Sequence, residues 1–79
     1  MGESIRIGGK YRHFKGNEYR VIHVARHSET LEEYVVYQAL YGEGGIWVRP
    51  LDMFLGTRDV DGVPVKRFQA ITEDGLILA

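Results

Sequence analysis

The sequence predicts a mostly β, small SH3-like fold: a five-stranded antiparallel barrel or half-barrel with a single 3₁₀ turn before its last strand. Short runs rich in β-branched and aromatic residues alternate with turn residues along the chain, which is the pattern of successive hairpins. The 79 residues suffice for one domain only, spanning 1–79 with a core over about 10–71. A lone open sheet of this size leaves long edges unpaired, so closure or half-closure is expected.

The first hairpin is the clearest local prediction. A short strand is expected over Lys10–Phe14, and residues 15–17 (Lys-Gly-Asn) supply a tight turn. A longer strand then covers Glu18–Arg26. Its alternation of apolar and polar residues shifts between Val21 and Ile22, which predicts a β-bulge at that point.

The middle of the chain predicts a second hairpin. Residues 27–30 (His-Ser-Glu-Thr) break the strand pattern and form a loop. Glu32–Tyr41 begins with residues compatible with a helix, but the run Tyr-Val-Val-Tyr at 34–37 favours a strand. The glycine-rich residues 42–45 make the next turn, and Ile46–Arg49 is the return strand.

The last third predicts one turn of helix and one strand. Leu51–Leu55 is too short for a long helix and fits a 3₁₀ turn. Residues 59–62 form a turn, and the last strand covers Val63–Ile71. Residues 73–79 fit either a small added strand or a frayed tail, and the residues before Lys10 form a flexible lead-in.

Residues 45–54 resemble the passage from glycine through proline to an aromatic residue that precedes the final strand of SH3-like barrels. This likeness concerns the fold and carries no function. Trp47 lies in this passage, on a strand that we expect to be central, so its ring is predicted to be largely buried.

Several sequence blocks occur in order over most of the chain, from Lys10 to Phe68. They are YRHFKG at 11–16, ARHSET at 25–30, VVY and LYG at 35–42, WVRP with MF at 47–54, and VPVKRF at 63–68. In these blocks the chain resembles a small bacterial family of domains of unknown function. The resemblance implies no agreed activity, cofactor or catalytic residue.

Composition narrows the classes of protein that fit. The chain has no cysteine, which excludes a disulfide framework, a thiolate zinc site and a cysteine nucleophile. No apolar run approaches the roughly 20 residues of a membrane span, and the first residues lack the pattern of a signal peptide. A cytoplasmic protein without a membrane partner is therefore expected.

Charge is unevenly distributed although the formal net charge is -1. Residues 4–27 hold one acid, Glu18, and six bases: Arg6, Lys10, Arg12, Lys15, Arg20 and Arg26. Residues 28–61 hold two bases, Arg49 and Arg58, and seven acids: Glu29, Glu32, Glu33, Glu43, Asp52, Asp59 and Asp61. The asymmetry indicates either two partner surfaces or attraction between neighbouring strands of one sheet.

Three sets of residues are candidates for chemistry. Residues 26–29 (Arg-His-Ser-Glu) hold a base, a hydroxyl and a carboxylate, but neighbouring residues of a strand point to opposite faces. The three histidines match no familiar metal-binding spacing, so neither a metal nor another cofactor is predicted. Arginine and aromatic residues are enriched at binding hot spots, and they supply the candidate ligand-binding set: Arg12, Arg26, His27, Arg49, Tyr37 and Tyr41.

Three functional classes remain open. A binding module that recognises an anionic ligand, a peptide or a protein through arginine and aromatic side chains is favoured. Binding of single-stranded nucleic acid is the alternative, because small barrels stack bases on exposed aromatics beside a basic groove. A small hydrolase-like enzyme is the least favoured class, since no catalytic motif occurs and a chain of 9.0 kDa leaves little room for a pocket that excludes water.

Overall fold

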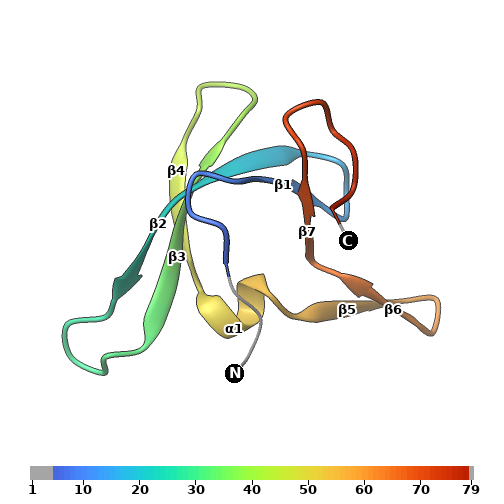
Figure 1. Cartoon of the computed structure of the whole chain (residues 1–79). Helices are drawn as coiled ribbons and strands as arrows, with labels where there is room; N and C mark the ends of the chain where they lie inside the picture. Colours follow the sequence, from blue (N-terminus) through green and yellow to red (C-terminus); the bar gives the residue numbers. More distant parts are fainter. Residues whose placement is uncertain (1–4, 79) are drawn as a thin grey trace.

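The computed structural model describes residues 5–78, which form a strongly curled antiparallel sheet, a small hairpin and one turn of helix (Figure 1). Within that range the elements follow the chain in this order: β1 (Lys10–His13), β2 (Glu18–Arg26), β3 (Glu33–Ala39), β4 (Ile46–Pro50), α1 (Leu51–Phe54), β5 (Thr57–Val60), β6 (Val63–Lys66) and β7 (Phe68–Ile71).

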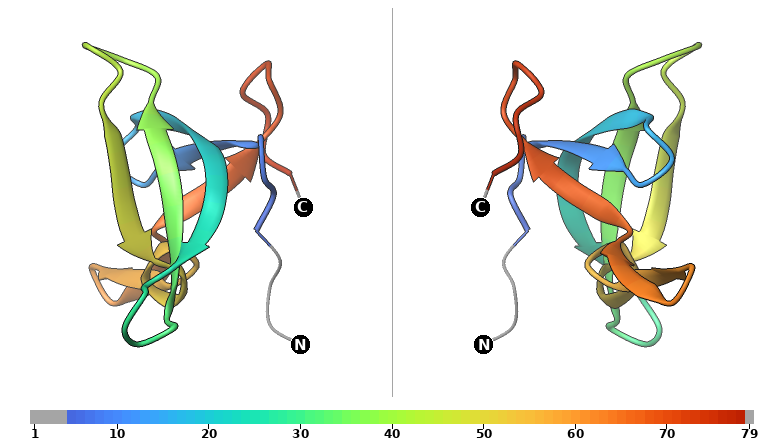
Figure 2. Two further views of the ribbon diagram at one scale, coloured as in Figure 1. Left: turned by 90° about the vertical axis from the view of Figure 1, so that its left-hand side faces the viewer. Right: turned by 90° about the vertical axis from the view of Figure 1, so that its right-hand side faces the viewer.

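The large sheet has the order β4-β3-β2-β1-β7, and β5 pairs only with β6. In the left view of Figure 2, β4, β3 and β2 stand side by side, while β1 and β7 cross behind them at an angle. The sheet therefore curls around one concave face but does not close, since β4 and β7 remain its two edge strands.

The β1–β2 hairpin forms where local turn chemistry predicts it. Gly16 has φ +108°, a conformation that an L side chain rarely adopts, and the backbone N–H of His13 donates to the carbonyl of Asn17 at 2.7 Å. In β2 the register shifts between Val21 and His23, so the predicted bulge is confirmed. Val21 there exchanges backbone hydrogen bonds with Gly8 and Gly9, which ties the segment before β1 to the sheet.

The core lies on the concave face of the sheet. Its buried members are Tyr11, Val21, Val35, Tyr37, Phe54 and Phe68. Phe54 of α1 is 0% exposed and stacks on Phe68 with the ring centroids 4.0 Å apart. It also meets Tyr11 and Tyr37 edge-on, each at 5.3 Å. The single turn of α1 is thus the element that fills the curled sheet from one end.

The mostly β, antiparallel prediction is confirmed, and β2 and β3 are the longest strands among residues 5–78, at 9 and 7 residues. One detail of the prediction is wrong. The turn before the last strands is α-helical, because the N–H of Leu55 bonds to the carbonyl four residues back, at Leu51. Of the two predicted forms, closed and half-closed, the sheet does not take the closed one, while the likeness to SH3-like barrels stays a prediction.

The end of the chain also differs from the prediction. The single strand expected over Val63–Ile71 is two strands, β6 and β7, which separate at Arg67. There the backbone N–H of Arg67 bonds to the carbonyl of Gly56 and extends the β5–β6 register by one pair, while its carbonyl accepts from the N–H of Phe14 and begins the pairing with β1. β5 was not expected, since Thr57–Val60 shows no alternation of apolar and polar residues.

Trp47 is exposed, against the prediction that its ring is largely buried. Its side chain is 58% exposed, and those of Ile46 and Val48 beside it are exposed as well. The reason is strand order: β4 pairs with β3 alone, so one side of β4 has no neighbouring strand. A strand that follows a hairpin can lie at the centre or at the edge of a sheet, and here it lies at the edge.

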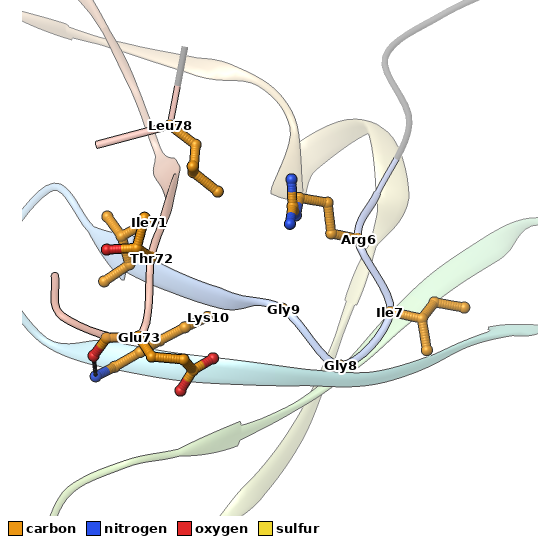
Figure 3. Close-up of a pocket in the computed structure, with 9 residues that line it drawn as sticks. All are labelled: Arg6, Ile7, Gly8, Gly9, Lys10, Ile71, Thr72, Glu73 and Leu78. Carbon is orange, nitrogen blue, oxygen red and sulfur yellow. Dashed lines mark hydrogen bonds between the residues drawn. The ribbon is translucent and has the colours of Figure 1, made fainter. Parts of the chain in front are cut away.

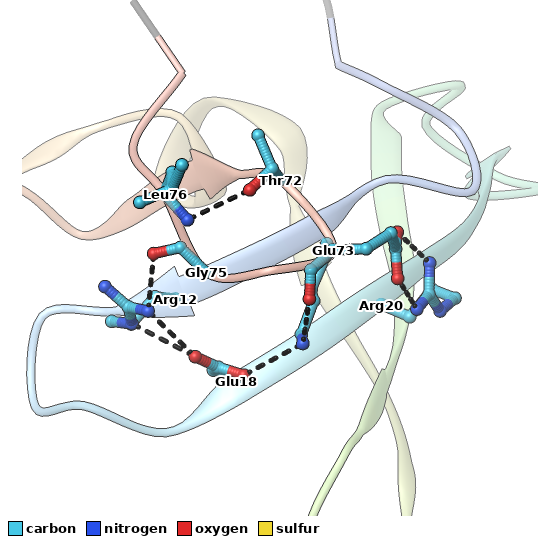
Figure 4. Close-up of polar contacts among 8 residues, drawn as sticks. Arg12, Glu18, Arg20, Thr72, Glu73, Gly75 and Leu76 are labelled. Carbon is cyan, nitrogen blue, oxygen red and sulfur yellow. Dashed lines mark hydrogen bonds and ion pairs between the residues drawn. The ribbon is translucent and has the colours of Figure 1, made fainter.

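The described part of the C-terminal segment is ordered against β1 and β2. After β7 the chain turns back, so that Ile77 bridges Ile71 and the N–H of Leu78 bonds to the carbonyl of Ala70. Arg20 binds both carboxylate oxygens of Glu73, at 3.0 and 2.7 Å (Figure 4). Of the two alternatives for residues 73–79, the added strand is the nearer description for 76–78.

Three bases of the N-terminal third have carboxylate partners in or near this segment. Glu18 pairs with both Lys10 and Arg12, at 3.2 and 3.0 Å, and Arg20 pairs with Glu73 (Figure 4). Hydrogen bonds from Arg12 and then Lys10 hold the pKa of the Glu18 carboxyl below its usual range. Much of the charge asymmetry is therefore neutralised within the fold, by acids on β2 and after β7 instead of by the acidic middle of the chain.

Candidate anion-binding site

The structure does not gather the predicted ligand-binding residues into one surface. Arg12 lies opposite Glu18 at the start of β2, and Arg26 is the last residue of the same strand. Glu18 and Arg26 are eight residues apart in this strand, which is a distance of about 26 Å along extended chain. Arg12 is also bound to Glu18 and to the carbonyl of Gly75, so its guanidinium stabilises contacts within the fold.

Arg26 and His27 line a shallow hollow of about 270 Å³ with Ala25, Tyr34 and Val48. The ring of His27 serves the adjoining loop. Its Nδ1 accepts hydrogen bonds from the backbone N–H groups of Glu29 and Thr30, at 3.1 and 3.3 Å. We therefore assign His27 to the stability of the turn that follows β2.

The two tyrosines of the predicted set differ in position. Tyr37 is 5% exposed and belongs to the core, where its hydroxyl accepts a hydrogen bond from Nε of Arg49 at 3.4 Å. Tyr41 is exposed, and its hydroxyl lies 2.9 Å from that of Tyr19. Burial first, and then the hydrogen bond with Tyr41, raises the pKa of Tyr19 to about 12.

A group of cations that the sequence did not bring together surrounds His13 at the end of β1. We call Lys15, Arg49, Arg58 and Arg67 the cationic cluster; these residues come from the β1–β2 turn, β4, β5 and the break before β7. Their convergence follows from the curl of the sheet: β1 pairs with β7, which places His13 opposite Phe68.

Aromatic rings hold three of these cations in place. The guanidinium of Arg49 lies 5.6 Å from the ring centroid of Phe68. The ring of Phe14 carries Lys15 at 5.9 Å and Arg58 at 5.5 Å. A cation within about 6 Å of a ring is attracted to its face, and this attraction supplies no counter-charge of full magnitude. The cluster is thus positioned without being neutralised.

The charged groups around His13 all act on its pKa in one direction. Burial lowers the pKa of His13, and the positive charges of Arg49, Arg67, Lys15 and Arg58 lower it further, while no carboxylate acts in the opposite direction. The ion pairs found in residues 5–78 all lie elsewhere, on Lys10, Arg12 and Arg20. In addition, the Nε atom of Arg67 is buried and has no hydrogen-bond partner.

The neutral imidazole of His13 completes the site with a hydrogen-bond donor. Its Nδ1 accepts from the backbone N–H of Lys15 at 3.2 Å, which leaves the proton of the neutral ring on Nε2. The rings of Phe14 and Phe68 lie 4.5 and 4.9 Å from the ring of His13. An anion at this site would therefore lie near several cations, the Nε2–H donor of His13 and the rings of Phe14 and Phe68.

A larger hollow lies away from the cationic cluster, between residues 6–10 and 71–73 (Figure 3). It measures about 560 Å³ and is open to solvent. Two of its charged residues already have partners: Glu73 binds Arg20 through its carboxylate, and the carbonyl of Glu73 accepts from Nζ of Lys10. The hollow lies where the C-terminal segment packs against β1, and we do not assign a ligand to it.

Metal binding has no support from the arrangement of side chains. Among residues 5–78, no three side chains of His, Asp or Glu come close enough to hold an ion. In the same part of the chain, no helix has the length and apolar character required to cross a bilayer.

We expect His13 to make the domain less stable as the pH falls below about 6.5. Its pKa in the folded protein lies below the ordinary value of 6.5, so the unfolded chain takes up this proton first. Stability is unaffected by the group above that pH, declines as the pH falls through it, and levels off below the folded pKa. Urea denaturation at a series of pH values from about 7.5 to 5 measures this decline.

In the same series, the variant His13→Gln should lose this part of the decline, because glutamine does not titrate. The matched control is His23→Gln, which removes an exposed histidine on β2 and leaves His13 in place. An unchanged pH dependence in His13→Gln would assign the decline to other groups.

Comparison with known proteins identifies the family. The family described as "Protein of unknown function (DUF1653)" matches residues 9–70. The chain belongs to this family. A crystal structure of a DUF1653 protein from Bordetella bronchiseptica is 36% identical in sequence, with a TM-score of 0.73, over 95% of this chain and 94% of that one. None of the curated proteins matches the chain.

The matched range of the DUF1653 family includes the whole cationic cluster and Trp47. The segment that binds Arg12 and Arg20, with Glu73 and Gly75, lies beyond residue 70 and outside this range. Membership of this family assigns no function to the domain, so the evidence for one comes from the residues around His13.

Proposed function

We propose that this DUF1653 domain is a binding module for an anionic partner, which it holds at the cationic cluster. One observation carries the proposal: four cations from four separate segments lie around His13 and the rings of Phe14 and Phe68, and none of them has a carboxylate partner among residues 5–78. Like charges repel, so a fold that gathers them without acids loses stability that a bound anion restores.

The local geometry supports a bound anion over catalysis. The ring hydrogen bonds of His13, His23 and His27 in the described chain all involve backbone groups, so no side-chain acid or nucleophile is paired with an imidazole. General acid–base and nucleophilic mechanisms require such pairs. The guanidinium groups of Arg49 and Arg67, in contrast, are suited to the planar, bidentate recognition of phosphate or carboxylate.

Removal of two exposed cations from the cluster tests this function. Lys15→Gln combined with Arg58→Gln should weaken the binding of inorganic polyphosphate about 2- to 30-fold, since each exposed charge pair contributes about 0.2–1 kcal/mol. Isothermal titration calorimetry at low salt measures the affinity. Both side chains are exposed and lie over the ring of Phe14, so the fold should tolerate the change.

The matched control is Arg6→Gln with Arg26→Gln, which changes the net charge equally at two exposed arginines outside the cluster. The control should bind polyphosphate nearly as tightly as the parent protein. Equal loss in both double variants would indicate attraction by net charge alone, and no loss in either would remove the cluster from the proposal.

A further inference from the structure

Trp47 is placed beside the cationic cluster on the same face of β4 as Arg49. Residues two apart on a strand point to the same side, with Cα atoms about 7 Å apart. Trp47 lies opposite Tyr37, and Arg49 lies opposite Val35, which are both core residues of β3. The two side chains thus follow one line along the open edge of the concave face.

The indole ring is 58% exposed and belongs to an edge strand. It lies close to Gly45, where a Cβ would come within 3.3 Å of the indole Nε1. Exposed large aromatic rings on a small domain mark contact surfaces, because their apolar area is otherwise left in water. The ring therefore offers a flat apolar face next to uncompensated positive charge.

We propose that this surface binds single-stranded nucleic acid, with a base stacked on Trp47 and the adjoining phosphates at Arg49 and the rest of the cationic cluster. The inference rests on the proposed function and names its ligand. A stacking ring combined with a basic surface is the combination that single-strand binders use. An acidic peptide offers no planar ring for the indole, and in a duplex the bases are already stacked and paired.

The decisive measurement uses the chain's one tryptophan, so its intrinsic fluorescence reports on Trp47 alone. An oligo(dT) of about 12 nucleotides, within the range of sites on small barrels, should quench this emission saturably. Polyphosphate of the same number of phosphates should bind at the cluster and compete with the oligonucleotide, with little quenching of its own.

The variant Trp47→Ala separates the inference from the proposed function. It should bind fluorescently labelled oligo(dT) about 5- to 150-fold more weakly, which corresponds to about 1–3 kcal/mol for one stacked base, and keep its affinity for polyphosphate. Trp47→Phe should recover part of the loss, since a phenyl ring also stacks. Thermal unfolding of both variants controls for folding.

Three results would overturn the inference. Trp47→Ala that binds oligo(dT) like the parent protein would remove the stacking and leave the proposed function standing. Tighter binding of a duplex of the same length, or of polyglutamate, would assign the surface to a different partner. Failure of the parent protein to bind either oligo(dT) or polyphosphate would overturn the inference and the proposed function together.

Discussion

Replacement of Phe54 by alanine is expected to cost about 3–5 kcal/mol of the free energy of unfolding. Phe54 is fully buried, stacks on Phe68 and meets Tyr11 and Tyr37 edge-on, so the truncation empties the centre of the curled sheet. A domain of this length has about 4–12 kcal/mol in total. Thermal unfolding followed by circular dichroism should therefore show a melting temperature at least about 12 °C lower, or no folded protein.

The matched control is Trp47→Ala, which also removes an aromatic ring. Because the indole is 58% exposed on an edge strand, its loss should change the stability by no more than about 1 kcal/mol. An equal loss of stability in the two variants would show that Trp47 is covered in solution. A Phe54→Ala protein that melts with the parent would place the centre of the core elsewhere.

Those parts of the fold that depend on local chemistry could be predicted from the sequence. The bounds of β2 at Glu18–Arg26, the turn at Gly16 and the bulge after Val21 all follow from neighbouring residues. The β5–β6 hairpin also had a local signal. Asp61 and Gly62 both have positive φ, at 52° and 81°, as the two-residue turn of an Asp-Gly hairpin requires. The turn was predicted, but the charged strand before it was not.

The position of Trp47 could not be predicted because edge and centre are properties of strand order. The sequence shows that β4 follows β3, and nothing in its own residues says whether a further strand covers its free side. The expectation that Trp47 is buried rested on a central place for this strand in the sheet. In this fold β7 returns to β1 instead of β4, which leaves the indole exposed.

The candidate site was predicted only in its residue types. The sequence predicted a site of arginine and aromatic residues, and the choice among them depends on which cations have acid partners. Arg12 was chosen and is bound to Glu18, whereas Lys15, Arg58 and Arg67 were not chosen and form no ion pair within residues 5–78. Pairing of Arg20 with Glu73 across 53 residues has no signal in a single sequence.

Binding of oligo(dT) to the domain should weaken about 50-fold between 50 and 200 mM salt. For a single strand, the slope of log K against log salt is about −0.7 for each phosphate neutralised, so the four cations of the cluster predict a slope near −2.8. His13 adds no charge at neutral pH, since its pKa lies below the ordinary value. Fluorescence titrations at four or five salt concentrations give the slope.

The variants divide this salt dependence into two independent parts. Lys15→Gln with Arg58→Gln leaves two cations, so the slope should fall to about −1.4 and the same rise in salt should weaken binding only about 7-fold. Trp47→Ala should lower the affinity at every salt concentration and leave the slope unchanged, because stacking of a base releases no counterions. A slope that changes in Trp47→Ala, or persists in the double variant, would mean that ring and cations do not act on one strand as proposed.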